Sequence, residues 1–130
     1  MKYDALLEKA KKAKENAYVP YSNFRVGAAL LCKNGDVYTG CNVENAAYGP
    51  TCCAERVAVF KAVSNGNKEF EAIAVTSDSD DVTYPCGVCR QVLAEFALDM
   101  DVISSNKDLE NEVLKVEELL PRAFTGKEME

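Results

Sequence analysis

The chain has 130 residues, of which 48% are hydrophobic and 28% charged, and its formal net charge at pH 7 is −6. This acidic balance disfavours binding to a nucleic-acid backbone, which depends on Lys and Arg side chains. The sequence has no histidine, so Ser-His and Cys-His nucleophilic systems and imidazole-ligated metal sites are excluded. The length fits one domain over residues 1–130. No apolar run approaches the roughly 20 residues of a membrane span, so we expect a cytoplasmic protein without membrane contact.

The apolar periodicity predicts elements that alternate between helices and strands. In chain order they are a helix over residues 4–17, strands over 24–32 and 37–42, a helix from 51 or 52 to 63, a strand over 72–76, a helix over 85–98, strands over 100–104 and 112–116, and a helical turn over 117–121. This order indicates an α/β fold, a three-layer α/β/α sandwich around a five-stranded mixed sheet. We expect an antiparallel pair at the hairpin and parallel pairing across the strand–helix–strand units.

Two local features near the N-terminal end can also be predicted. Asn34 and Gly35 are typical of a two-residue hairpin turn, which would place Cys32 opposite Val37 in the neighbouring strand. In the first helix, lysines alternate with alanines and are expected on the solvated face; they are Lys9, Lys11, Lys12 and Lys14.

Three cysteines have the spacing of metal ligands. Cys86 and Cys89 stand three apart at the start of a predicted helix, so both thiols lie on one face of its first turn, and Cys53 lies in the first turn of another helix. Three thiolates at two helix N-termini can hold one Zn²⁺ and leave its fourth position for water, as in catalytic zinc sites. Two alternatives remain open. One is a structural zinc with a fourth protein ligand, although Cys52 points about 100° away from Cys53 on a helix, and the other is a redox dithiol.

Glu55 follows Cys53 by two residues and shares its helix face with Ala58, Val59 and Ala62. An unpaired buried carboxylate is costly, so burial raises the pKa of such a group and lets it carry a proton near neutral pH. We therefore expect Glu55 to be the catalytic acid and base. The alternative is an ordinary N-terminal glutamate that interacts with the helix dipole.

Two arginines are candidates to offset the negative charge of the thiolates. Zn²⁺ with three thiolates has a net negative charge, which weakens the metal as a Lewis acid, and a cation bonded to sulfur would compensate for it. Arg56, three residues after Cys53, is the first candidate, and Arg90, beside Cys89, is the second. The alternative for both is an ordinary surface arginine.

Residues 51–56 and 85–91 resemble the zinc signature of cytidine deaminases, in particular the small homotetrameric type whose ligands are all cysteines. The resemblance extends over most of the chain. Residues 18–30 are similar to the family's N-terminal segment, residues 40–49 to its ribose-binding loop and residues 119–124 to its C-terminal motif.

The resemblance implies a role for each residue of the substrate site. Phe24 would stack on the pyrimidine ring, and the Ala54 backbone and Glu55 would bind the edge of the base. Asn42 and Glu44 would hydrogen-bond the ribose 3′-hydroxyl. The 2′-hydroxyl would then contribute little to recognition, so deoxycytidine would also be accepted. From the residues alone, Phe24 could equally be a core aromatic residue and Asn42 the end of a strand.

In this family neighbouring subunits complete each site, and Tyr48 and Phe124 match the residues that do so; Phe124 taken alone could be a core aromatic residue. The resemblance thus implies a homotetramer with shared sites and one Zn²⁺ per subunit. The implied activity is hydrolytic deamination of cytidine and deoxycytidine to uridine and deoxyuridine plus ammonia, in pyrimidine salvage. The rival interpretations are a blasticidin-type deaminase, a polynucleotide deaminase and a zinc-stabilised interaction domain without chemistry.

Overall fold

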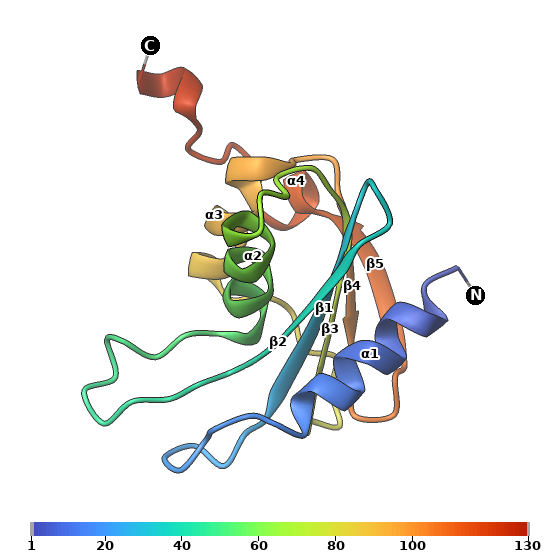
Figure 1. Ribbon diagram of the computed structural model, residues 1–130, viewed down its shortest axis with the longest axis vertical. Helices are drawn as coiled ribbons and strands as arrows, with labels where there is room; N and C mark the ends of the chain where they lie inside the picture. Colours follow the sequence, from blue (N-terminus) through green and yellow to red (C-terminus); the bar gives the residue numbers. More distant parts are fainter. Residues whose placement is uncertain (1, 130) are drawn as a thin grey trace.

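A mixed five-stranded sheet is the middle layer of the molecule, and helices cover both of its faces (Figure 1). The computed structural model describes residues 2–129. The strands are β1 (Val26–Cys32), β2 (Val37–Cys41), β3 (Phe70–Ser77), β4 (Asp101–Ser105) and β5 (Asn111–Lys115), in the order β2-β1-β3-β4-β5 across the sheet. The predicted three-layer fold around a five-stranded mixed sheet is confirmed.

The direction of pairing follows from the connections. β3 and β4, which a helix connects, are parallel, and the other neighbouring pairs are antiparallel. The predicted parallel pairing therefore holds for β3 and β4. β2 and β3 also run in the same direction, but β1 lies between them.

The helices divide unequally between the two faces of the sheet. α1 (Asp4–Lys14) lies on one face, and α2 (Ala54–Ser64) and α3 (Gly87–Phe96) lie on the other, as Figure 1 shows. A short helix, α4 (Val116–Leu119), and a 3-10 helix, η1 (Gly126–Met129), follow β5. None of the helices within residues 2–129 has the length and apolar character that crossing a membrane requires.

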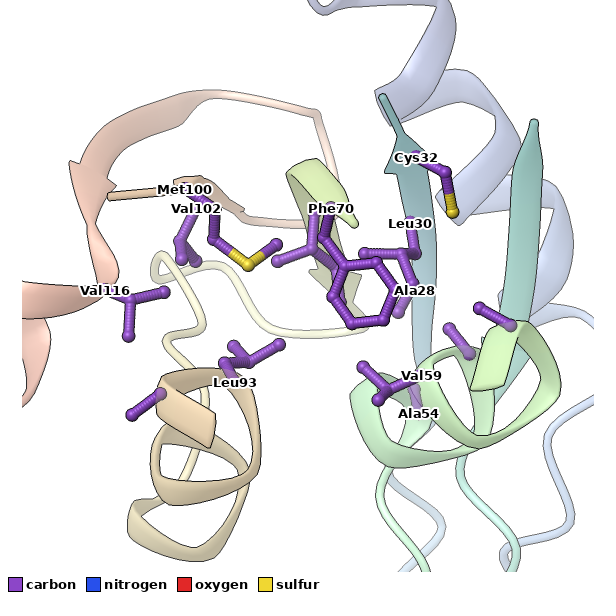
Figure 2. Packing of buried hydrophobic residues seen from close by; sticks show 14 residues of the cluster. Ala28, Leu30, Cys32, Ala54, Val59, Phe70, Leu93, Met100, Val102 and Val116 are labelled. Atoms are coloured by element: carbon purple, nitrogen blue, oxygen red, sulfur yellow. The ribbon is translucent and has the colours of Figure 1, made fainter. Parts of the chain in front are cut away.

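Each face of the sheet has its own apolar core. Under α1 the core includes Leu7 and Ile103, and under α2 and α3 it is built around Phe70, Val59 and Leu93, each at most 2% exposed. Figure 2 shows the side chains of Val59 and Leu93 pointing toward the Phe70 ring. Burial of a side chain of this size contributes about 1.5 to 3 kcal/mol. These contacts hold both helices in place on the sheet.

A close backbone approach fixes the start of α2. A Cβ atom built on Gly40 of β2 would lie 2.4 Å from the Ala54 carbonyl oxygen and 2.7 Å from the Ala58 amide nitrogen. Only glycine leaves room for a helix this close to a strand. The first turn of α2 therefore rests directly on the main chain of β2.

The register of the β1–β2 hairpin differs from the prediction by one residue. Leu31, not Cys32, is opposite Val37. The Cys32 amide donates to the Asp36 carbonyl at 2.8 Å, and Gly35, with a φ of 95°, closes the turn by donating to the Cys32 carbonyl at 3.0 Å. The loop therefore has three residues and ends on a left-handed glycine, which is the next most common hairpin geometry after the two-residue turn.

Several helix boundaries also differ from the predictions, by one to three residues. α2 begins at Ala54 and α3 at Gly87, each after a cysteine cap, Cys53 or Cys86, whose backbone is extended (ψ 155° and 170°). α1 ends at Lys14 rather than at residue 17. Cysteine is not among the residues that commonly cap helices, so no sequence signal marks the two starts. The two thiols consequently lie just before their helices.

Lys14 is buried, which contradicts its predicted place on the solvated face of the first helix. Its side chain is 9% exposed, and its Nζ lies 3.1 Å from Asp78 Oδ1 and donates to the Ser77 carbonyl at 3.2 Å. Arg25 also binds this carboxylate, with Nε 3.0 Å from Oδ2 and Nη2 3.1 Å from Oδ1. Hydrogen bonds from Arg25 first and then from Lys14 lower the pKa of Asp78 to about 2.

We expect the Asp78→Asn variant to lose less stability than the wild type on acidification. The folded-state pKa lies below the ordinary one, so the ion pairs stabilise the fold above about pH 4. That contribution is lost as the pH falls through the folded-state value of about 2. Its size is about 1 to 2 kcal/mol after allowance for solvent screening. Denaturant unfolding of both proteins at several acidic pH values measures it. A difference in the free energy of unfolding that does not change with pH would contradict the assignment.

Candidate active site

Three thiols converge where the N-termini of α2 and α3 meet. The Sγ atoms of Cys53, Cys86 and Cys89 all lie within 4.8 Å of one another, and those of Cys53 and Cys86 are 3.7 Å apart. In a tetrahedral site with Zn–S bonds of about 2.3 Å, two sulfur atoms lie about 3.8 Å apart. The spacing fits Zn²⁺. Within residues 2–129 this metal-binding group contains no further side chain, so one tetrahedral position stays open.

The protonation of the cluster also fits a cation. Hydrogen bonds from Cys89, Arg56 and Cys86 lower the pKa of the Cys53 thiol, whereas hydrogen bonding to Cys53 and burial raise the pKa of Cys89. The Cys53 thiolate thus keeps the Cys89 thiol protonated. All three thiols can ionise together only when a metal ion shares their charge, and metal binding then releases the protons.

The two candidate arginines have different partners. Arg56 Nη2 donates to Cys53 Sγ at 3.3 Å, and this contact raises the pKa of the guanidinium. Arg90 donates instead to two carbonyl oxygens, from Nε to Pro85 at 2.7 Å and from Nη1 to Leu119 at 2.8 Å. The structure therefore brings Arg56 to a ligand sulfur, while Arg90 ties the segment before Cys86 to α4.

Glu55, in the first turn of α2, is buried as expected. Its residue is only 4% exposed, and its neighbours Ala58 and Val59 are fully buried. Burial above all, and then the negative charge of Cys53, raise the pKa of this carboxyl to about 7. A carboxyl group with such a pKa can both accept and donate a proton at neutral pH.

A cleft of about 310 Å³ extends from the thiols to the predicted substrate residues. This volume is typical of small-molecule sites. Cys53 and Cys86 line it together with every predicted substrate residue except two; those that line it are Phe24, Asn42, Glu44, Ala54 and Glu55.

Asn42 and Glu44 hold the main chain on one side of the cleft. The Asn42 amide accepts from the Val26 N–H and donates to the Phe24 carbonyl, both at 2.9 Å. Glu44 accepts from the Tyr21 and Ser22 amides, both at 3.1 Å, and from the Ser22 hydroxyl. The Ser22 hydroxyl chiefly lowers the pKa of Glu44. Glu44 therefore stays ionised and can accept a hydrogen bond from a ligand hydroxyl.

Tyr48 and Phe124 lie outside the cleft. They are 72% and 60% exposed, and Tyr48 packs edge-on against Tyr21 with 6.2 Å between ring centroids. The Phe124 carbonyl accepts from Gln91 Nε2 at 2.7 Å. In Figure 1 the loop after β2 and the C-terminal segment project away from the sheet. The structure does not bring these two rings to the cleft of their own chain.

Several residues that line the cleft could not be assigned to it from the sequence, among them Ser22, Thr83 and Tyr84. Ser22 follows a proline-tyrosine pair in a turn. It becomes a hydrogen-bond partner of Glu44 only because the fold brings together two residues that are 22 positions apart in the sequence. Tyr84 immediately precedes the proline of the second cysteine motif, which was the available signal for its proximity to the thiols. Its hydroxyl donates to Glu112 Oε1 on β5 at 3.0 Å.

Three thiols with one open metal position and a buried carboxyl at the end of a small-molecule cleft define a zinc-dependent hydrolytic site. Residues 1–105 match a family model described as the cytidine and deoxycytidylate deaminase zinc-binding region. The chain belongs to this deaminase family. The matched region contains all three thiols, and their spacing fits Zn²⁺, the cofactor of this family.

Similar proteins cover nearly the whole chain. A cytidine deaminase from Sporosarcina psychrophila is 50% identical over 99% of this chain and 96% of its own length. Another from Halalkalibacterium halodurans is 51% identical over 95% of each. The crystal structure of cytidine deaminase from Burkholderia pseudomallei, 48% identical, superimposes with a TM-score of 0.92 over 95% of this chain and 100% of that one.

We expect Cys53→Ala to lose most of its zinc and Cys52→Ala to keep one equivalent. Cys53 belongs to the three-thiol group, whereas Cys52 does not. Losing one of three ligands leaves too few donors for a stable zinc site. Elemental analysis of both purified variants measures the metal content. Loss of zinc from the Cys52 variant alone would reassign the ligand.

Proposed function

We propose that this chain hydrolyses cytidine and deoxycytidine to uridine and deoxyuridine, releasing ammonia. One observation carries the proposal: a buried carboxyl, Glu55, lies beside a three-thiol zinc site in a cleft of about 310 Å³. Membership in the deaminase family supports it. The acidic net charge of −6 favours a nucleoside over a polynucleotide substrate.

The chemistry divides between the cofactor and the chain. Bound Zn²⁺ supplies an acidified water as the nucleophile toward C4 of the base. The Glu55 carboxylate accepts a proton from this water and delivers it to N3 of the base. It then transfers the second proton of the same water to the departing amino group. Water and cytidine thus become uridine and ammonia. Arg56 supports the site by donating to Cys53 Sγ, which offsets the thiolate charge.

The cleft residues match the parts of a nucleoside. Phe24 provides a ring face for the base, and the Ala54 main chain lies next to Glu55 in the lining of the cleft. Ionised Glu44, with Asn42 next to it in the cleft, provides an acceptor for the ribose 3′-hydroxyl. We propose that the 2′-hydroxyl contributes little to recognition, so both ribose and deoxyribose are accepted.

Glu55→Gln should retain zinc and lower kcat for cytidine by about 10²- to 10⁴-fold, because the amide cannot shuttle protons. The loss of the ultraviolet band of cytidine follows the reaction. Glu95→Gln, on the exposed side of α3, is the matched control and should turn over normally. Near-wild-type kcat in the Glu55 variant would contradict the proposed role.

The substrate class is tested with the wild-type protein against four compounds. We expect cytidine and deoxycytidine to react, and blasticidin S and single-stranded DNA to react poorly or not at all. Preferential turnover of blasticidin S would favour a blasticidin-type deaminase, and turnover of the DNA a polynucleotide deaminase. No reaction with any of the four would favour a zinc-stabilised interaction domain.

We also propose a cytoplasmic homotetramer that acts in pyrimidine salvage, with residues 1–130 as one domain. The exposed rings of Tyr48 and Phe124 support shared sites, because large exposed aromatic side chains are typical of interfaces. A reducing compartment is supported by the free cysteines, which include the three thiols of the metal site.

Co-expression of two inactive variants should restore activity if sites are shared. We expect Phe124→Ala and Glu55→Gln each to be nearly inactive alone. In mixed tetramers, a site that takes Glu55 from one subunit and Phe124 from another recovers both, and random assembly gives about one such site in four. The measurement is cytidine turnover by the mixture. Activity no higher than that of the separate variants would exclude shared sites.

A further inference from the structure

We propose that Asp78, which lies outside the cleft, is a positioning residue for nucleoside binding. It fixes the wall that carries Phe24 relative to the loop after β3, whose last residues also line the cleft. The inference rests on the proposed function. It concerns how the site is held in shape rather than which groups touch the substrate.

The first observation is a reciprocal set of bonds between Asp78 and Arg25. The Arg25 amide donates to Asp78 Oδ2 at 3.1 Å, and the Asp78 amide donates to the Arg25 carbonyl at 3.2 Å. The guanidinium adds a two-pronged ion pair, with Nε 3.0 Å from Oδ2 and Nη2 3.1 Å from Oδ1. Paired contacts of this kind fix direction as well as distance.

The second observation is the buried cation on the same carboxylate. Lys14, the last residue of α1, places Nζ 3.1 Å from Asp78 Oδ1 and 3.2 Å from the Ser77 carbonyl. A buried lysine requires such partners, since desolvating an unpaired ammonium is costly. Asp78 therefore connects the end of α1, the segment that enters β1 and the end of β3.

The third observation links this cluster to the cleft. Asn42 bonds the Phe24 carbonyl and the Val26 amide, so it holds the main chain on both sides of Arg25. Asp78 holds Arg25 itself. The Phe24 wall is thus supported by two polar side chains, one inside the cleft and one behind it.

A second part of the cleft lining is connected to the same point. Thr83 and Tyr84 line the cleft at the end of the loop that begins after Ser77. The hydroxyls of Ser77 and Thr83 are hydrogen-bonded to each other, which closes this loop. Because Asp78 follows Ser77 directly, its bonds to Arg25 join the start of this loop to the segment that carries Phe24.

The expected consequence is a change in substrate binding rather than in the chemical step. Glu55 and Cys53 lie on or directly before α2, which rests on Gly40 of β2, whereas the side-chain bonds of Asp78 go to Arg25 and Lys14. Movement of the Phe24 wall weakens contacts that substrate and transition state share. Such a loss raises KM and leaves kcat nearly unchanged.

The test compares Asp78→Asn with Asp80→Asn in the zinc-loaded protein at neutral pH. Asp80 lies two residues further along and pairs with Lys107 at 2.6 Å, but its side chain is 83% exposed. We expect Asp78→Asn to raise KM for cytidine by about tenfold with kcat within about threefold of the wild type. The inhibition constant of uridine should rise in parallel. The Asp80 variant should match the wild type in all three values.

Two outcomes would overturn the inference. A variant that loses stability and kcat while KM stays unchanged would show a purely structural role, because partial unfolding removes active molecules without altering the others. An unchanged KM and kcat would show no role. If Asp78→Asn does not fold, Arg25→Met removes only the half-exposed guanidinium and should still raise KM by about threefold; an unchanged KM there overturns the inference as well.

Wild-type turnover of cytidine is measured first, so that the two proposals are separated. A wild-type protein that does not deaminate cytidine would contradict the proposed function and this inference together. Normal wild-type turnover with an unaltered KM in the Asp78 and Arg25 variants would overturn the inference alone.

Discussion

Sulfur atoms held within 4.8 Å of one another impose the main constraint on this molecule. Three thiolates repel, and only a cation, aided by helix dipoles and a nearby guanidinium, makes their ionised form stable there. The two helix N-termini satisfy this demand together, because Cys53 and Cys86 each cap one of them. The packing of α2 and α3 on the same face of the sheet is therefore part of the metal chemistry. Arg56, one turn from Cys53, adds the compensating positive charge.

Three carboxyl groups in or near the cleft have different roles, because their surroundings change their pKa values in different directions. Glu55 is buried among apolar neighbours, and the resulting rise in its pKa suits proton transfer. Glu44 is held ionised by amide and hydroxyl donors, which suits a hydrogen-bond acceptor. Asp78 is held ionised by two cations and serves as an anchor. The same functional group thus takes three roles, according to whether burial or donors dominate.

Much of the site could be predicted because its signals are local. The spacing of Cys86 and Cys89, and the position of Glu55 on an apolar face, are visible within single helical turns. The hairpin register was missed because the asparagine-glycine pair occurs in both two- and three-residue loops, and one residue changes every partner. The burial of Lys14 was missed because its partner Asp78 lies far along the chain. Thr83 and Tyr84 enter the cleft through loop geometry that no periodicity describes.

The contact between Gly40 and the first turn of α2 has a consequence for how the protein tolerates sequence change. Main-chain atoms, not side chains, set the height of this helix start above β2, with no room for a Cβ atom. The thiol at the helix cap therefore depends on this main-chain contact as well as on the apolar side chains that hold α2 on the sheet. A side chain introduced at position 40 would push the first turn of α2 away from β2 and displace Cys53 with it. Position 40 is thus constrained by the metal site although it contributes no ligand to it.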